Sequence, residues 1–319
     1  MSIFTTLPRE CYDDRAFGDF DPKTDGFVLA NARAMAWAAQ LAYETDTPEK
    51  MRDVAAAWGF ANLEPLNVQH KVAIFLKVTD TRGFVAAGDK ATIVGFSGTD
   101  PPNLANWITN FDAGMTEFDG ARIHAGFLRA TLAARPLLEA ALDRLHVSGR
   151  PLYVVGHSLG AAVAVVAAHL IARDPQRPVS GVYAFGMPRT GDQAFAEACC
   201  ALLGDRIYRL VHGNDIVPGV PFDLAKFNYR HVGRYLRCPS SGSFMAADLT
   251  PGSSSNEPDL GRDALERLKA EFVRASSWQW PPMSFDSRAL LKAFIETLPG
   301  QIRDHLPDKY IAACAAPAP

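Results

Sequence analysis

The chain has 319 residues, of which 48% are hydrophobic and 21% are charged, so it can build a globular fold with a sizeable core. A formal net charge of -3 argues against a nucleic-acid partner, because such proteins carry a basic face. The five cysteines lack metal-ligand spacing, so we expect reduced thiols. We also expect no metal and no organic cofactor.

The N-terminus has no basic start followed by an apolar run, as a secretory signal would. The longest apolar stretch, 159–172, is too short to span a bilayer. We therefore expect no transmembrane anchor and a cytoplasmic protein, with a trimmed signal or secretion by another route left open. A single α/β domain over residues 1–319 is predicted, with a disordered tail at 313–319.

Strand-like and helix-like segments alternate along most of the chain. We expect helices at 26–44, 48–58, 127–146, 159–172, 192–203, 263–275 and 287–297, and strands at 72–78, 83–87, 91–96, 150–155, 182–185 and 207–211. This alternation predicts an α/β fold, a mostly parallel central sheet with helices on both faces.

The sequence around Ser158 predicts a strand, a sharp turn and a helix. Gly156 and Gly160 flank the serine two residues away on each side, where a side chain would collide with the neighbouring strand and helix. Such a turn exposes a serine hydroxyl for nucleophilic attack, and the helix after it begins with unpaired amides that favour negative charge. By itself, a G-x-S-x-G pattern also occurs by chance in many proteins.

A nucleophilic serine needs a histidine base and a carboxylate that orients it, and in such sheets both follow the serine in the chain. Asp215 follows the strand at 207–211 directly and is preferred as the acid. Asp192 is the alternative, although its place before a helix is typical of an N-cap.

Four histidines follow the serine. His169 lies within the apolar helix and is expected to pack in the core, and His212 is expected to support the loop of the acid. His231 competes with His305, which comes last in the chain, where the third member of the triad belongs.

An oxyanion hole needs two donors aimed at one point. The first expected donor is the amide of Leu159, which directly follows the nucleophile. The second is expected from the loop 97–100, which follows a buried strand; Gly98 would allow close approach there, and the Thr99 hydroxyl could steady the loop.

Several separate stretches, in order along the chain, resemble the class 3 lipases, which are the fungal-type triacylglycerol lipases and their bacterial and plant relatives. The resemblance covers roughly residues 70–235 and the end of the chain. The matching stretches are 93–99, 106–112, 123–127, 156–160, 183–189 with Gly191, 209–218, and Asp304-His305 with Tyr310.

The resemblance implies an α/β-hydrolase fold, with Ser158 as nucleophile, Asp215 as orienting acid, His305 as base, and Thr99 and Leu159 as oxyanion hole. It also implies that His231 and His124 are structural. The implied activity is hydrolysis of acylglycerol-type lipids by a serine carboxylic-ester hydrolase, with transient contact at a lipid interface. The alternatives are a short-chain esterase, a phospholipase A1, or a non-catalytic binding module.

The sequence departs from the family pattern in three places. Ser97 stands where arginine is usual, and Ala161 stands where a further glycine is usual. The segment 100–105 is too short for the usual lid helix. We therefore predict that the connector 239–300, between acid and base, covers the site; the competing interpretation is that its aromatic residues only attach two helices to the body.

Overall fold

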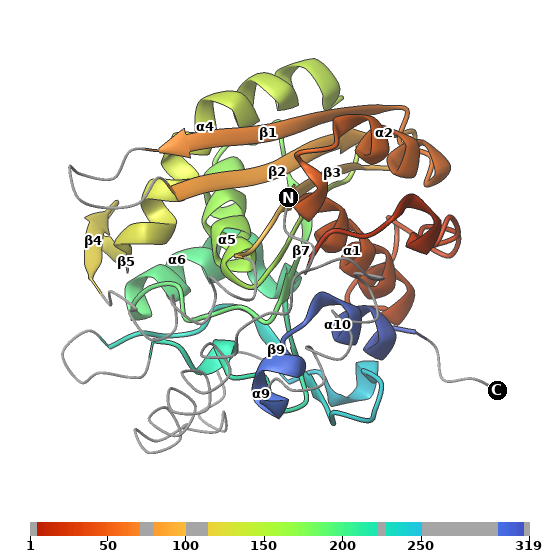
Figure 1. Ribbon diagram of the computed structural model, residues 1–319. Coiled ribbons are helices and arrows are strands. Elements are labelled where there is room, and N and C mark those ends of the chain that lie inside the picture. Colours follow the sequence, from red (N-terminus) through yellow and green to blue (C-terminus); the bar gives the residue numbers. More distant parts are fainter. Residues whose placement is uncertain (1–4, 71–78, 100–113, 222–227, 251–298, 316–319) are drawn as a thin grey trace, which may run out of the picture.

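The computed structural model describes residues 5–70, 79–99, 114–221, 228–250 and 299–315. These residues form a seven-stranded sheet in the order β1-β2-β3-β6-β7-β8-β9 and a two-stranded sheet, β4-β5 (Figure 1). The strands are β1 (Asn62–His70), β2 (Thr79–Ala87), β3 (Thr92–Phe96), β4 (Met115–Phe118), β5 (Ala121–His124), β6 (Leu152–His157), β7 (Val179–Phe185), β8 (Ile207–His212) and β9 (Arg234–Cys238). The α-helices are α1 (Leu29–Leu41), α2 (Pro48–Ala57), α4 (Ala125–Leu145), α5 (Leu159–Ile171), α6 (Gln193–Leu203), α9 (Gly300–Arg303) and α10 (Pro307–Ala313).

The sheet changes character along its width. Strands β1, β2 and β3 pair antiparallel, whereas β3, β6, β7, β8 and β9 pair parallel. The carboxyl ends of the parallel strands lie along one edge, and α/β sheets carry their ligand chemistry outside that edge. The loops that follow β3, β6, β7 and β8 therefore converge there.

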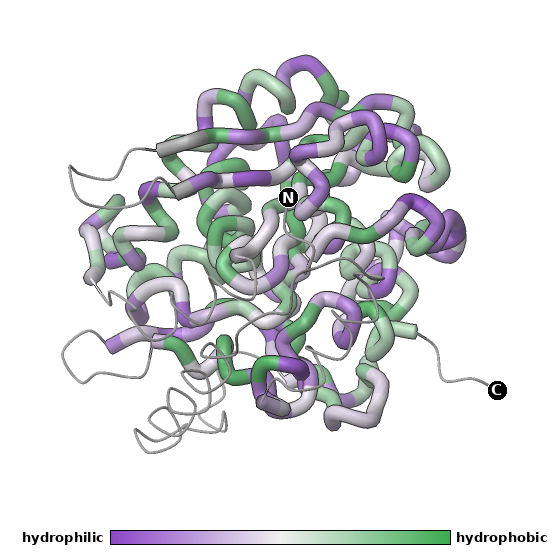
Figure 2. Tube along the Cα trace, in the orientation of Figure 1, coloured by the Kyte–Doolittle hydropathy of each residue, from purple (hydrophilic) through white to green (hydrophobic). Residues whose placement is uncertain are grey.

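Alternating side chains of the sheet build two cores. Tyr153 and Val155 of β6 face a cluster that includes α1, α2 and α10, whereas Val154 faces a cluster that includes α4, α5 and α6. Helix α5 is mostly apolar (Figure 2) and is buried at almost every position, because it lies between the sheet and α4. The predicted α/β fold with helices on both faces is confirmed.

Four strands were not expected from the sequence. Strand β1 carries Pro65 in the middle, and proline is tolerated there because β1 is at the edge of the sheet. Strands β4 and β5 have four residues each, too few for a clear periodic pattern, and β9 became a strand only by pairing with β8. The strand predicted at 72–78 and the helices predicted at 263–275 and 287–297 lie outside the described residues.

The disordered tail was predicted to begin too early. Ala313 is the last residue of α10, its carbonyl accepts a hydrogen bond from the Phe244 amide (2.9 Å), and both Ala313 and Cys314 are buried. These small apolar residues are ordered because they fill the core beside α1. Residues 316–319 and most of the connector, 251–298, lie outside the described residues, so the covering role of 239–300 stays a prediction.

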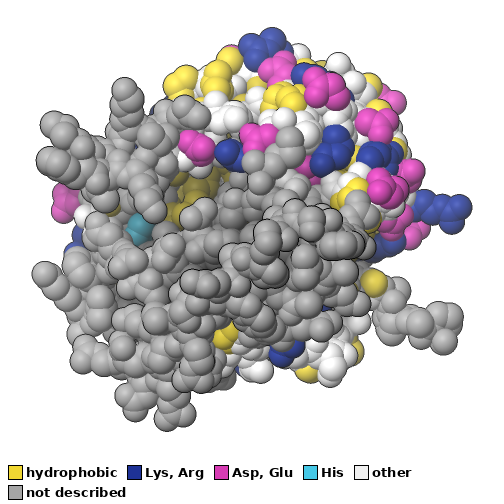
Figure 3. Space-filling model, viewed as in Figure 1, with side chains coloured by type: hydrophobic (Ala, Val, Ile, Leu, Met, Phe, Trp, Pro, Cys, Tyr) yellow, Lys and Arg dark blue, Asp and Glu magenta, His cyan; other side chains and the backbone are white. Residues whose placement is uncertain are grey.

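The surface shows no concentration of charge of one sign on the described part of the face in Figure 3, where acidic and basic side chains are interspersed. Within the described ranges, no helix has both the length and the apolar character needed to cross a membrane.

Candidate active site

Ser158 occupies a strained turn between β6 and α5. Its backbone has φ 61° and ψ -133°, a region that costs a non-glycine residue about 1–3 kcal/mol. The Ser158 amide donates to the carbonyl of Phe185 at the end of β7 (2.8 Å). A Cβ at Gly160 would lie 2.4 Å from the Phe96 carbonyl, which confirms that the turn needs glycine there. Packing thus holds the serine in a conformation that few sequences tolerate.

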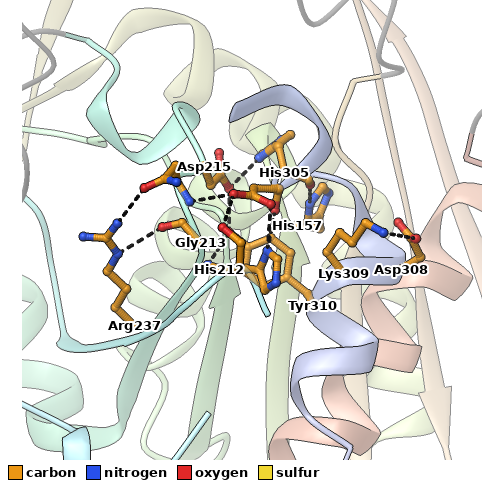
Figure 4. A network of polar contacts seen from close by, with 12 residues as sticks. His157, His212, Gly213, Asp215, Arg237, His305, Asp308, Lys309 and Tyr310 are labelled. Atoms are coloured by element: carbon orange, nitrogen blue, oxygen red, sulfur yellow. Dashed lines mark hydrogen bonds and ion pairs between the residues drawn. The ribbon is translucent and has the colours of Figure 1, made fainter. Parts of the chain in front are cut away.

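Asp215 and His305 form a buried pair at the same edge of the sheet (Figure 4). His305, between α9 and α10, places Nδ1 2.7 Å from Oδ2 of Asp215, which follows β8. The second carboxylate oxygen accepts from the Val217 amide (2.8 Å), and the Tyr310 hydroxyl donates to Oδ2 (2.5 Å). Because an ionised carboxylate only accepts, Nδ1 of His305 carries the proton and Nε2 is left as an acceptor.

The end of β7 is where the serine and the buried pair meet. Gly186 has φ 58°, and a Cβ there would lie 2.8 Å from Oδ2 of Asp215 and 2.9 Å from two ring atoms of His305. The preceding residue, Phe185, receives the hydrogen bond from the Ser158 amide. Ser158 therefore contacts Phe185, while Asp215 and His305 lie against the next residue, Gly186.

Two polar atoms at this point remain without a hydrogen bond. Oγ of Ser158 and Nε2 of His305 are both buried and have no hydrogen-bond partner among the described residues. Ser158 is 0% exposed and His305 is 2% exposed. A hydroxyl donor and an imidazole acceptor are thus both available for chemistry and shielded from water.

His157 supports the base, and the sequence analysis did not anticipate this role. Its Nε2–H donates to the carbonyl of His305 (2.7 Å), and its Nδ1 accepts from the Tyr43 hydroxyl (2.8 Å). Burial, and then the charge of His305, lower the pKa of His157, so this ring stays neutral. The available signal was a histidine directly before the nucleophile, but its partners come from segments more than 100 residues away.

Tyr310 supports the acid from α10. Besides donating to Asp215, its hydroxyl accepts from the His212 amide (3.2 Å). Burial, followed by the negative charge of Asp215, raises the pKa of Tyr310, so the phenol remains a donor. The resemblance had marked Tyr310 as a motif position without giving it a role.

The two residues expected to form an oxyanion hole lie beside Ser158. Thr99 ends the described part of the loop after β3, and a Cβ on the neighbouring Gly98 would lie 2.6 Å from Cβ of Ser158. Leu159 is the first residue of α5, so its amide belongs to the first turn and has no acceptor within the helix. The motif 106–112 lies outside the described residues.

The competing residues have other partners. His124 caps α4 by accepting two backbone amides, and Asp192 caps α6 by accepting the Phe195 amide, as expected for an N-cap. His169 is buried and contacts an arginine of the following turn (2.9 Å), and His231 contacts a backbone carbonyl (3.0 Å).

No group of three or more metal-ligating side chains gathers within the described residues. The five cysteines are free thiols.

Comparisons with known proteins agree on one family. The family model "Lipase (class 3)" matches residues 93–225. A secreted mono- and diacylglycerol lipase of Fusarium solani is 38% identical over 136 residues, which cover 41% of this chain and 39% of the relative. A secreted mono- and diacylglycerol lipase of Penicillium cyclopium is 31% identical over 182 residues, covering 54% and 57%.

The solved structure of a lipase from Rhizopus microsporus var. chinensis is similar with a TM-score of 0.53 and 25% identity, covering 72% of this chain and 80% of that one. The sheet order and the serine turn thus define an α/β-hydrolase. Together with the family match over residues 93–225, they support the class 3 lipase family for this chain.

The chain spans between two fifths and three fifths of the length of the two curated relatives described above. Both are named as secreted proteins, so they do not support the cytoplasmic location expected from the sequence.

Proposed function

We propose that the protein is a serine carboxylic-ester hydrolase that acts on acylglycerol-type lipids. Ser158 is the nucleophile, His305 the general base and Asp215 the carboxylate that orients it. The backbone amides of Thr99 and Leu159 form the oxyanion hole. No metal or organic cofactor takes part in this scheme.

The reaction proceeds by acyl transfer in two halves. Oγ of Ser158 bonds to the ester carbonyl carbon while Nε2 of His305 accepts the hydroxyl proton, and the two amides hold the oxyanion. The carbon–oxygen bond to the alcohol then breaks, and His305 gives its proton to the leaving alkoxide. Water repeats the cycle on the acyl-enzyme and releases the fatty acid, while Asp215 stays ionised and fixes the imidazole tautomer.

The observation that carries the proposal is the pair of buried atoms without partners. Leaving one buried polar atom without a hydrogen bond costs about 1–3 kcal/mol. Here Oγ of Ser158 and Nε2 of His305 are both buried without a hydrogen bond, beside the strained backbone of Ser158 and the buried Asp215–His305 pair. A protein that only binds a ligand has no reason to maintain this arrangement, so it favours an enzyme over a binding module.

The substrate class rests on the relatives. The lipases of Fusarium solani and Penicillium cyclopium are named for mono- and diacylglycerols, and an Arabidopsis thaliana relative, 29% identical over 214 residues, is named a triacylglycerol lipase. On that basis, we propose that the substrate of this protein is an ester between a fatty acid and glycerol.

The test is hydrolysis of p-nitrophenyl esters, from short to long acyl chains, by the wild type and Ser158→Ala. The matched control is Ser148→Ala, on an exposed loop away from the sheet edge. We expect Ser158→Ala to lower turnover about 10⁴-fold or more, because the triad acts as a unit, and Ser148→Ala to leave it unchanged.

A rate that peaks at long chains supports the lipase proposal. A short-chain peak would make the protein an esterase instead. The absence of turnover by the wild type at every chain length would refute the serine mechanism and favour the binding module.

A further inference from the structure

Asp304, the residue directly before His305, connects the segment of the base to the segment of the acid. Its Oδ2 accepts a hydrogen bond from the backbone amide of Asn214 (2.8 Å) and another from Oγ of Ser240 (2.7 Å). Asn214 directly precedes Asp215. Asp304 is thus the neighbour of His305 in the sequence, and its carboxylate binds the neighbour of Asp215. The side chain of Asp304 is 13% exposed.

Gly213 makes room for this carboxylate. It has φ 54°, and a Cβ there would lie 2.3 Å from Oδ2 of Asp304 and 2.4 Å from Oγ of Ser240. From β9, Arg237 donates to the Gly213 carbonyl (3.0 Å) and to the Asn214 side chain (3.1 Å) (Figure 4). The acid loop is thus held by a cation on β9 and by the carboxylate of Asp304.

The backbone of Asp304 is fixed as well. Nδ1 of His212, the last residue of β8, lies 3.2 Å from the Asp304 carbonyl oxygen and 3.7 Å from its Oδ1. Both the main chain and the side chain of this residue are therefore docked on the end of the strand that leads to Asp215.

We propose that Asp304 is a positioning residue that keeps His305 in register with Asp215, an inference that rests on the proposed function of the site. The two residues are 90 apart in the chain, so their 2.7 Å contact depends on how the two segments are joined. Asp304 joins them next to the contact, through hydrogen bonds to its carboxylate. A misplacement of about 1 Å at a catalytic group can cost about 100-fold in rate.

Three variants separate the hydrogen bonds from the charge. Asp304→Ala removes both accepted bonds, and we expect kcat to fall about 10- to 100-fold while KM stays within about twofold. Asp304→Asn keeps an oxygen that can accept from both donors, and we expect its kcat within about threefold of the wild type. Ser240→Ala removes one of the two hydrogen bonds, and we expect its kcat to fall about two- to fivefold.

The matched control is Asp192→Ala. This carboxylate also accepts two hydrogen bonds through one oxygen, here from the backbone amides of Phe195 (3.0 Å) and Arg122 (3.2 Å), and it caps α6. We expect it to lower the melting temperature without changing kcat. If Asp304→Ala loses only melting temperature, as this control does, its role is merely structural and the proposal is overturned.

A second readout does not require turnover. The low-field proton NMR resonance of His305 Nδ1–H, assigned by its absence in His305→Asn, reports the hydrogen bond to Asp215. We expect it in the wild type and Asp304→Asn, and we expect it broadened or lost in Asp304→Ala. An unchanged resonance and an unchanged kcat in Asp304→Ala overturn the proposal.

If Asp304→Ala does not fold, Ser240→Ala decides, and wild-type kcat and resonance in that variant overturn the proposal. A wild type that shows the resonance but no Ser158-dependent hydrolysis refutes the proposed function alone, and the resonance still tests the role of Asp304.

Discussion

Replacing Tyr310 with phenylalanine tests how far the acid depends on its neighbours. The hydroxyl donates to Asp215 at 2.5 Å and accepts from the His212 amide at 3.2 Å, and all three residues are buried. Losing a donor to a charged acceptor costs about 1.5–3 kcal/mol, and the amide left without an acceptor adds about 1–3 kcal/mol. Because these contributions overlap, we expect the free energy of unfolding of Tyr310→Phe to fall by about 2–5 kcal/mol.

The same change should slow catalysis. Asp215 keeps its bonds to the Val217 amide and to His305, so the pair survives but loses one of the three donors that fix the carboxylate. We expect kcat/KM to fall about tenfold, through poorer orientation of the imidazole. The assays are urea unfolding and ester hydrolysis on the same preparation.

Tyr12→Phe is the matched control. Its hydroxyl also donates to a buried carboxylate, that of Glu44 (2.9 Å), which is paired with Lys50 rather than with a member of the triad. We expect a comparable loss of stability with unchanged kcat/KM. If both variants lose activity in proportion to their stability, or if Tyr310→Phe keeps full activity, the argument that Tyr310 acts on the triad is wrong.

Two further outcomes can be checked directly. Gly186→Ala should abolish most activity, because its Cβ would collide with Asp215 and His305. Gly26→Ala, which also has a positive φ but open space around it, should lose only about 1–2 kcal/mol of stability. Burial lowers the pKa of His169 from 6.5 to about 4, with the nearby Arg173 charge as the second cause. Between pH 6.5 and about 4, the unfolded chain therefore binds more protons than the folded chain, so the free energy of unfolding should decline as the pH falls through this range. In urea unfolding at several pH values, His169→Gln should remove about 1–3 kcal/mol of that decline. The same pH dependence of stability in the wild type and the variant would contradict the lowered pKa of His169.

The sequence by itself determined the α/β class and the serine turn. Both follow from local patterns. Apolar strands that alternate with helices favour a covered parallel sheet, and Gly156 and Gly160 lack the side chains that would collide with their neighbours in the serine turn. The order of serine, acid and histidine also pointed to Asp215 and His305. The structure places them 2.7 Å apart.

Only the tertiary structure decided which polar groups support these residues. The local sequence does not reveal the partners of His157, Tyr43 and Tyr310, because these partners lie about 90 to 150 residues away and meet them only when the sheet assembles. The same holds for Asp304, whose carboxylate reaches two other segments. Hydrogen bonds of this kind depend on distances of a few tenths of an ångström, and such distances are set by the packing of the whole sheet rather than by any single stretch of sequence.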